Sequence, residues 1–300
     1  MTVRLLLLKL SPVIGGHSSA LDAALITAHV LKTTRERLYL DPDRELSADE
    51  IDAAWQLATR RQSGEPIAYL LGYKEFYGRR FVVDSRVLVP RPDSEIMIEA
   101  VLRKLQGNTA RWFSHAGANR PLRILDLCCG SGCLGITLAA EIPDCEIVLA
   151  DIDPAALAVA EKNAFLLLPP DRQPTCICSD LFAAIEGRFD VIISNPPYVT
   201  ETEYRELRMD RWQEPRHALT AADDGLEIIR RIADTVVDYI YPHGYVAIEA
   251  SDRQAPAICD LLVNKSFTEV SHVLDLAGKR RVTGGVYLGQ TADKAVTDGA

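Results

Sequence analysis

Strand-like and helix-like segments alternate along the chain from about residue 122 onward, and this alternation restricts the possible folds more than any other feature. Short apolar stretches predict strands over residues 123–127, 146–150, 175–179, 189–194 and 245–250. Between them, apolar residues recur at helical spacing over residues 133–141, 155–165, 225–239 and 254–263. Such a βαβ series predicts an α/β domain with a mostly parallel sheet, Rossmann-like in arrangement, that helices cover on both faces.

The two flanks of this series have a different character. Apolar residues before residue 72 recur at helical spacing, and Ser47 to Glu50 has the pattern of a capping box that opens a helix. The stretch from Tyr73 to Asp84 predicts a short hairpin that turns at Gly78, and residues 268–274 and 281–288 predict a terminal antiparallel hairpin. We therefore expect three parts: an N-terminal helical domain (1–72), a hairpin with linker (73–92) and an α/β domain (93–300).

Composition excludes several classes of protein. The 300 residues are 48% hydrophobic and 25% charged, which is typical of a folded globular chain. A net charge of −9 argues against stable nucleic-acid binding, which needs a basic face. No apolar run approaches the roughly 20 residues that span a bilayer, and the run that Lys9 closes has no signal-peptide cleavage site, so we expect a cytoplasmic protein. The seven cysteines lack the paired spacing of metal sites, so we expect neither disulfides nor a metal.

A glycine loop follows the first strand of the series. Gly130, Gly132 and Gly135 satisfy the spacing G-x-G-x-x-G, so a dinucleotide is a legitimate ligand. Asp126 stands at the mouth of this loop, where its negative charge would repel a pyrophosphate. It suits a ligand with an ammonium group instead, such as the methionine part of S-adenosylmethionine. We therefore expect S-adenosylmethionine rather than NAD, and NAD stays as the alternative.

Two further carboxylates follow the next strands. Asp151 ends the second strand, where it can accept hydrogen bonds from a ribose diol. Its alternative role, capping the next helix, suits Asp153 better because Asp153 directly precedes Pro154. Asp180 follows the third strand and can accept from an adenine amino group, with Leu181 behind it to cover the ring. A turn or capping role for Asp180 stays open.

The turn Asn195-Pro196-Pro197-Tyr198 is the strongest functional signal in the chain. Its two prolines stiffen the turn and remove two amide donors, which leaves acceptors at the carboxyl end of the sheet. A planar NH2 group can donate to the Asn195 side chain and to the Pro196 carbonyl, with the Tyr198 ring stacked on it. When the two hydrogens of this NH2 group are bound by acceptors, the positive charge that develops on the nitrogen during methylation is stabilised. An ordinary rigid turn is the alternative.

These residues resemble the amino-group methyltransferases that carry an (Asn/Asp)-Pro-Pro-(Tyr/Phe) turn, and further motifs narrow the resemblance to the HemK/PrmC family. The stretch 60–72 is similar to the family's RR-x-x-GEP-x-AY-x-x-G, and residues 75–78, 87–95, 214–219 and 224–226 agree with it as well. This family comprises the release factor glutamine methyltransferases. The resemblance implies a helical substrate-recognition domain, a connecting hairpin and a Rossmann-like methyltransferase domain. It also implies a reaction: S-adenosylmethionine methylates the glutamine amide in the Gly-Gly-Gln motif of class I peptide chain release factors.

The resemblance also implies roles for individual residues. Asn195, Pro196, Pro197 and Tyr198 would form the catalytic turn that holds the glutamine amide. The cofactor would be lined by a set of ten residues: Asp126, Cys128, Cys129, Gly130, Ser131, Gly132, Asp151, Asp180, Leu181 and Asn195. Arg91 and Glu95 would lie beside the active site. Cys128 and Cys129 stand where the family has Gly and Thr. Residues 126–128 and 131–133 are also similar to the sister family that methylates a ribosomal-protein glutamine.

Two other classes of function stay open at this point. An adenine-amino DNA methyltransferase would use the same turn, because adenine also presents a planar NH2 group, but it would need a basic target-recognition region. A binding protein that keeps the fold without catalysis would not need Asn195 and Tyr198, since neither is required for folding.

Overall fold

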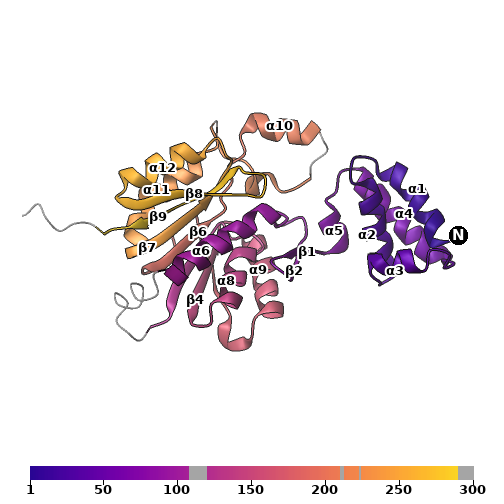
Figure 1. Ribbon diagram of the computed structural model, residues 1–300, viewed down its shortest axis with the longest axis horizontal. Helices are drawn as coiled ribbons and strands as arrows, with labels where there is room; N and C mark the ends of the chain where they lie inside the picture. The colour runs from indigo at the N-terminus through magenta and orange to yellow at the C-terminus, as the bar shows by residue number, and fades with distance from the viewer. Residues whose placement is uncertain (108–119, 210–212, 223, 290–300) are drawn as a thin grey trace, which may run out of the picture.

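The computed structural model describes residues 1–107, 120–209, 213–222 and 224–289. Figure 1 shows a group of N-terminal helices beside a larger part built on a central sheet, with a short hairpin between them. No helix in these described ranges has the length and apolar character needed to cross a membrane.

Five helices form the N-terminal part. They are α1 (Val3–Ile14), α2 (Ser19–Val30), α3 (Arg35–Leu40), α4 (Ala48–Gln62) and α5 (Ile67–Leu71). Their buried side chains, among them Leu6, Leu10 and Ile26, pack into a cluster separate from the cores around the sheet. The predicted capping box at α4 is confirmed, because the Ser47 hydroxyl accepts from the Glu50 N–H while Glu50 Oε2 accepts from the Ser47 N–H at 2.8 Å.

The predicted hairpin joins the N-terminal helices to the sheet. Strands β1 (Tyr73–Phe76) and β2 (Arg79–Val82) pair antiparallel, and the turn at Gly78 is confirmed. Phe76 and Phe81 meet edge to face at 6.1 Å between ring centroids and lie in the same apolar cluster as helices that cover the sheet. The hairpin is therefore attached to the α/β part by burial of its aromatic side chains.

The central sheet has seven strands in the order β5-β4-β3-β6-β7-β9-β8. Their bounds are β3 (Leu122–Leu127), β4 (Cys145–Asp151), β5 (Thr175–Cys178), β6 (Phe189–Ser194), β7 (Ile240–Glu249), β8 (Phe267–Leu274) and β9 (Arg280–Tyr287). Strands β3 to β7 run parallel, and β9 runs antiparallel to β7 and β8. The predicted Rossmann-like parallel sheet with a terminal antiparallel hairpin is confirmed.

One strand boundary differs from the prediction by more than one residue. Strand β7 begins at Ile240, five residues before the predicted start at residue 245. Its pairing with β6 shifts between Ile240 and Tyr245, and Pro242 and Gly244 lie within this irregular stretch. Proline and glycine weaken a strand pattern in sequence, but both are tolerated where the ladder is interrupted.

Helices cover both faces of the sheet. One face packs against α6 (Glu95–Gly107), α8 (Cys133–Glu141) and α9 (Pro154–Leu167), and the other against α11 (Glu227–Tyr239) and α12 (Ala255–Asn264). All residues of β6 are buried, as expected for a parallel strand covered twice. The remaining elements are short: η1 (Pro92–Ser94), η2 (Pro170–Arg172), α10 (Glu201–Met209) and η3 (Arg216–Ala218).

A single buried side chain of α9 connects the hairpin with the loop after β3. Asn163 accepts from the Val82 N–H at 2.7 Å and donates to the Val82 carbonyl at 3.0 Å. Its Nδ2 also donates to the Ser131 carbonyl at 2.9 Å. Because Asn163 is fully buried, these three backbone groups have little access to water as a substitute partner.

We predict that Asn163→Ala lowers the free energy of unfolding by about 2–4 kcal/mol, since it leaves buried backbone groups without partners. Urea denaturation followed by circular dichroism measures this change. The control is Asn264→Ala, at an exposed asparagine, which we expect to cost no more than about 0.5 kcal/mol. A loss at Asn163 no larger than the control's would contradict the role of this side chain.

Candidate active site

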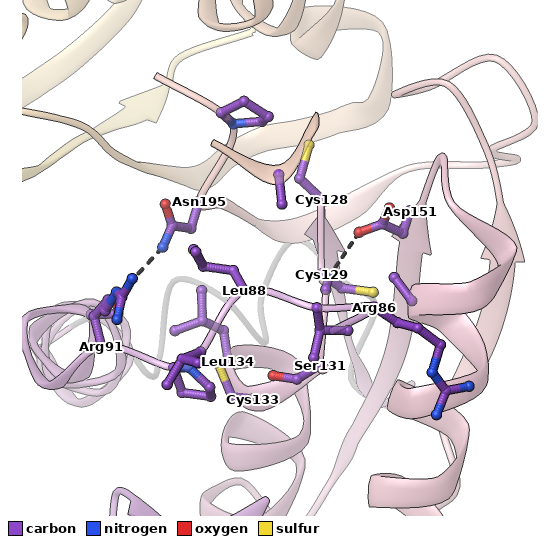
Figure 2. A pocket seen from close by; sticks show the side chains of 18 of the residues that line it. Arg86, Leu88, Arg91, Cys128, Cys129, Ser131, Cys133, Leu134, Asp151 and Asn195 are labelled. Carbon is purple, nitrogen blue, oxygen red and sulfur yellow. Dashed lines mark hydrogen bonds between the residues drawn. The ribbon is translucent and has the colours of Figure 1, made fainter. Parts of the chain in front are cut away.

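A pocket opens at the carboxyl ends of β3 and β6, where the strand order of the sheet reverses. Ligands of open α/β folds bind in the crevice at this point. The glycine loop forms one wall with Cys128, Cys129, Gly130 and Ser131, and residues 86–91 form another. Ten further residues complete the lining: Ser94, Cys133, Leu134, Asp151, Ile152, Ala156, Asn195, Pro197, His217 and Ala218. In Figure 2, Asn195 and Arg91 lie on one side of this pocket, and Asp151 and Arg86 lie on the other.

Backbone hydrogen bonds hold the glycine loop in place. The Cys129 N–H donates to the Ala150 carbonyl at 3.0 Å, and the Gly132 N–H donates to the Cys129 carbonyl at 2.8 Å. Gly132 has a φ of +75°, and a Cβ there would lie 2.7 Å from the Ile136 side chain. This tight reversal positions the start of α8 directly behind the pocket.

Asp126 lies behind the loop rather than on the pocket surface. It is fully buried, and its Oδ2 accepts from the Gly135 N–H at 2.8 Å. A Cβ at residue 135 would come within 3.1 Å of this carboxyl and 2.4 Å of Leu149, so only glycine lets α8 approach so closely. Oδ1 of Asp126 has no hydrogen-bond partner, and burial raises the pKa of the carboxyl to about 7.

Asp151 does line the pocket, as a member of the predicted set. One of its oxygens accepts from the Gly130 N–H at 2.8 Å and the other from the Asp153 N–H at 3.0 Å. Burial raises the pKa of Asp151, and these two backbone bonds oppose the shift. Asp153 caps α9 through the Ala155 N–H at 2.8 Å, as predicted.

Asp180 and Leu181 fall outside the lining of this pocket. Both Asp180 oxygens accept from Arg231 at 2.8 Å, in an ion pair whose side chains are about half exposed. Leu181 is buried in the apolar cluster around β6 and α11. Asp126 and Gly132 are likewise absent from the lining, so the structure brings together Cys128, Cys129, Gly130, Ser131, Asp151 and Asn195 of the ten predicted residues.

A second pocket adjoins the first one, and Asn195 belongs to both. This second pocket is lined by Pro196, Tyr198, Val199, Leu219 and Glu249, and it shares Leu88, Arg91, Asn195 and Ala218 with the first. Three of the four residues of the predicted turn therefore face one cavity, and Pro197 faces the other. The amide of Asn195 stands at the junction between the two.

Several contacts fix the turn from behind. Asn195 Nδ2 donates to Ser94 Oγ at 3.4 Å, and the Tyr198 hydroxyl donates to Glu249 Oε1 at 3.5 Å. Gln254 Nε2 donates to the Tyr198 carbonyl at 3.0 Å. Gly225 has a φ of +71°, and a Cβ there would lie 2.2 Å from that carbonyl, so a larger residue would displace the turn.

A partly buried ion pair joins the two segments that border both pockets. Glu214 is buried, accepts from the Val89 N–H at 2.9 Å and pairs with Arg91. Arg91 thus lines both pockets, in contact with the segment that carries His217 and Ala218. Glu95 does not line either pocket, because its Oε1 accepts from the Tyr77 N–H at 2.9 Å and ties α6 to the hairpin.

Sequence reasoning missed Ser94, Glu249 and Gln254. Glu249 could have been found by the criterion that selected Asp151, since it lies near the end of the predicted strand 245–250. The motif at residues 87–95 contains Ser94 but gives it no role, and no pattern in the sequence marks Gln254. Both side chains contact residues far away in the sequence, about 100 and 56 positions distant.

The cysteine that replaces a family glycine sits in a conformation that favours glycine. Cys128 has a φ of +58°, and left-handed backbone costs an L-residue about 1–2 kcal/mol. Burial raises the pKa of its thiol to about 12, so the thiol is neutral and acts as an apolar side chain.

We predict that, at position 128, the glycine variant is more stable than the alanine variant by about 1 kcal/mol, because only alanine keeps the strained Cβ. Cys259 in α12 is the matched control, and there we expect the opposite order by about the same amount. Denaturant unfolding of the four variants measures both differences. The same order at both positions would contradict the strain at Cys128.

Comparison with known proteins shows similarity in two parts of the chain. The family model of the methyltransferase small domain matches residues 108–220, and that of the PrmC N-terminal domain matches residues 13–72. The catalytic domain of hMettl16, solved with an RNA hairpin, has the same fold, with a TM-score of 0.53 at 13% identity over 83% of this chain and 84% of that one.

Two curated relatives resemble the chain along most of its length. The release factor glutamine methyltransferase of Bordetella pertussis is 38% identical over 268 residues, which cover 88% of this chain and 94% of the relative. That of Koribacter versatilis is 38% identical over 271 residues, covering 89% and 91%. With such identity over nearly the whole of both proteins, the chain belongs to the family of release factor glutamine methyltransferases.

Proposed function

We propose that this protein uses S-adenosylmethionine to methylate the side-chain amide nitrogen of the glutamine in the Gly-Gly-Gln motif of a class I peptide chain release factor. The observation that carries the proposal is the place of Asn195 at the junction of two adjoining pockets. A methyl donor in one pocket and a planar amide in the other would meet at this side chain. The family to which the chain belongs supports the same substrate.

The residues of the first pocket suit S-adenosylmethionine. The unpartnered Oδ1 of Asp126 belongs to a buried carboxyl behind the glycine loop. This carboxyl gains a negative charge when a cationic ligand lowers its pKa, which favours such a ligand over a pyrophosphate. Asp151 offers its remaining lone pairs to a ribose diol, and Cys128 to Ser131 and Asn195 surround the ligand. Contact of Asp180 and Leu181 with the cofactor stays a prediction, because Asp180 forms an ion pair with Arg231 in this structure. When bound, S-adenosylmethionine supplies an electrophilic methyl group on a sulfonium.

The residues of the turn prepare the glutamine for reaction. The side-chain oxygen of Asn195 and the Pro196 carbonyl accept the two hydrogens of the NH2 group, and the Tyr198 ring flanks the amide plane. An amide nitrogen is a weak nucleophile, and two fixed acceptors stabilise the positive charge that it gains. Holding the nitrogen close to the methyl group lowers the reaction barrier further, through proximity. No general base is needed, because the nitrogen becomes far more acidic once it is methylated.

The charge distribution favours a protein substrate over DNA. Several arginines lie between residues 60 and 91. Those that pair with carboxylates of this chain are Arg60, Arg61, Arg79, Arg80, Arg86 and Arg91. Paired cations attract phosphates only weakly. We propose that residues 1–72 form the domain that engages the release factor and that residues 93–300 form the catalytic domain. Because release factors act in the cytoplasm, we propose the cytoplasm as the location of this protein.

Mass spectrometry of methyl transfer tests this function. We predict that the protein adds one methyl group to the Gly-Gly-Gln peptide of a release factor, and that Asn195→Ala lowers the rate at least about 100-fold because it removes one of the two acceptors. Asn264→Ala, far from the site in sequence and exposed, serves as the control that keeps full activity.

The same assay offers two competing acceptors. If a large-subunit ribosomal protein gained the methyl group in place of the release factor, the reaction would be the proposed one, but the protein substrate would be different. Methylated adenine in duplex DNA would contradict the substrate class. S-adenosylmethionine bound without transfer to any acceptor would favour a binding protein.

A second prediction concerns protons exchanged on cofactor binding. Asp126 has a pKa of about 7, and a nearby cationic ligand lowers it, so the carboxyl loses its proton when the ligand binds. We expect release of roughly half to one proton per site at pH 6.5 and almost none at pH 8.5. Calorimetry in buffers with different ionisation enthalpies measures this number.

Two variants assign the released proton. Asp126→Asn should abolish the release and weaken binding, whereas Glu249→Gln, which removes the other buried carboxyl with a pKa near 7, should keep it. Unchanged proton release in Asp126→Asn would contradict the role of Asp126.

A further inference from the structure

A buried glutamine between β7 and α12 contacts the catalytic turn from outside both pockets. Gln254 directly precedes α12, and 3% of its surface is exposed. Its Nε2 donates to the Tyr198 carbonyl at 3.0 Å and to the Asp224 carbonyl at 3.1 Å. Its Oε1 accepts from the Ser251 N–H at 3.1 Å and from the Ser251 hydroxyl at 2.8 Å. Gln254 is not among the residues that line either pocket, so the proposed reaction gives it no contact with a ligand.

These partners allow one orientation of the Gln254 amide. Its NH2 group faces two carbonyl oxygens, which only accept, and its oxygen faces a backbone N–H, which only donates. A reversed amide would place its oxygen against the two carbonyl oxygens and its NH2 group against the Ser251 N–H. In the observed orientation both hydrogens and both lone pairs have partners, as a buried amide requires. The amide therefore holds the Tyr198 carbonyl in a defined place.

The place of this carbonyl matters because the catalytic turn is stiff. Pro196 and Pro197 have fixed φ angles and no N–H groups, so the turn moves nearly as a unit and two of its residues offer no amide that could fix it. Its first end follows Ser194, the last residue of β6. Its other end is held by Gln254 at the Tyr198 carbonyl. A shift of that carbonyl would therefore also move the groups that face the substrate pocket.

Gly225 lies directly beside this contact. Its φ is +71°, and a Cβ there would lie 2.2 Å from the Tyr198 carbonyl oxygen and 2.4 Å from Gln254 Nε2. Only a residue without a side chain therefore lets the carbonyl and the amide meet. The same carbonyl can thus be disturbed in two ways, by removing the donors of Gln254 or by adding a side chain at residue 225.

We propose that Gln254 is a positioning residue for the methylation. Through the Tyr198 carbonyl it sets the place of the Pro196 carbonyl and of the Tyr198 ring in the substrate pocket, and Ser251 fixes the orientation of its amide. This inference rests on the proposed function, because the Pro196 carbonyl and the Tyr198 ring act on a bound NH2 group. Gln254 thus affects the reaction without touching either ligand.

Gln254→Glu tests this role, because it keeps the length of the side chain and replaces the NH2 group with a carboxylate oxygen. We expect kcat for release-factor methylation to fall at least about 10-fold, since a misplacement of about 1 Å can cost about 100-fold. Kd for S-adenosylmethionine should stay within about 3-fold, because the first pocket consists largely of the glycine loop and residues 86–91. An unchanged kcat, or a Kd that rises as much as kcat falls, would overturn the proposal.

Gln173→Glu is the matched control. Gln173 Nε2 likewise donates to backbone carbonyls at the end of α9, those of Ala164, Leu168 and Pro169, at 3.2, 2.9 and 3.2 Å. Gln173 is not among the residues that line either pocket. We expect this variant to keep kcat within about 2-fold of the wild type. An equal loss of kcat in both variants would show a general effect of destabilisation and would contradict a positioning role.

Gly225→Ala disturbs the same carbonyl in the second way. It should lower kcat as well, and its loss should not add to that of Gln254→Glu in the double variant, because both changes act on one group. Fully additive losses would contradict a common point of action.

A measurement on the free protein separates this inference from the proposed function. The dipeptide Tyr-Val occurs twice in the chain, at residues 198–199 and 245–246. With carbon-13 in the tyrosine carbonyls and nitrogen-15 in valine, a carbonyl–amide correlation spectrum therefore shows one signal for Tyr198 and one for Tyr245. Because Gln254→Glu removes a hydrogen bond from the Tyr198 carbonyl, the Tyr198 signal should shift. The signal of Tyr245, in the middle of β7, should stay in place.

The two kinds of failure can then be distinguished. If the wild type methylates no acceptor, the proposed function fails while the Tyr198 signal still tests the contact. An unshifted Tyr198 signal in Gln254→Glu would overturn the inference even if the wild type is active. Thermal melting checks that each variant is folded. If Gln254→Glu unfolds, Gln254→Met, which has a similar length and no charge or donor, takes its place with the same expected results.

Discussion

The site depends on the pairing of β3 with β6 at the centre of the sheet. Leu127 and Ser194 are neighbours at the carboxyl ends of these strands, and the Ser194 hydroxyl donates to the Leu127 carbonyl at 2.9 Å. From this point the chain leaves β3 toward α8 on one face and leaves β6 toward the segment that leads to α11 on the other. The two loops therefore diverge, and a crevice opens between them. The glycine loop and Asn195 meet there as a direct result of strand order.

Two buried carboxyls stand behind this crevice, one on each side of β6, the strand that Asn195 follows. Asp126 belongs to β3 and Glu249 to β7, and each has one oxygen without a partner. Burying a charge with incomplete hydrogen bonding opposes folding. An apolar residue at either position would stabilise the core more than a carboxyl does. We therefore interpret both carboxyls as parts of a binding and catalytic centre.

Much of the fold could be predicted from the sequence, because it depends on local patterns. The strands β3 to β6, the helix α8, the capping box of Ser47 and the terminal hairpin follow from periodicity and turn residues. The start of β7 could not be predicted, because Pro242 and Gly244 lie in an irregular stretch that only the pairing with β6 reveals.

The site was predictable in part for a similar reason. The turn at Asn195 and the glycine loop are contiguous in sequence, and the structure brings both to one place. Whether a carboxylate faces the pocket depends on distant partners: Gly135 holds Asp126 behind the loop, and Arg231 holds Asp180 outside the lining. Contacts such as that of Ser94 with Asn195 join residues that no local pattern connects.

Asn163 gives the molecule a mechanical property that neither pocket shows by itself. One amide group holds Val82 of the hairpin and Ser131 of the glycine loop. Local unfolding of the hairpin or of the glycine loop exposes the same buried Asn163 side chain. The free energies of these two local unfolding events therefore have a contribution in common. A ligand that ordered the glycine loop would therefore also stabilise the hairpin, and ordering the hairpin would stabilise the loop in return, because such coupling is reciprocal.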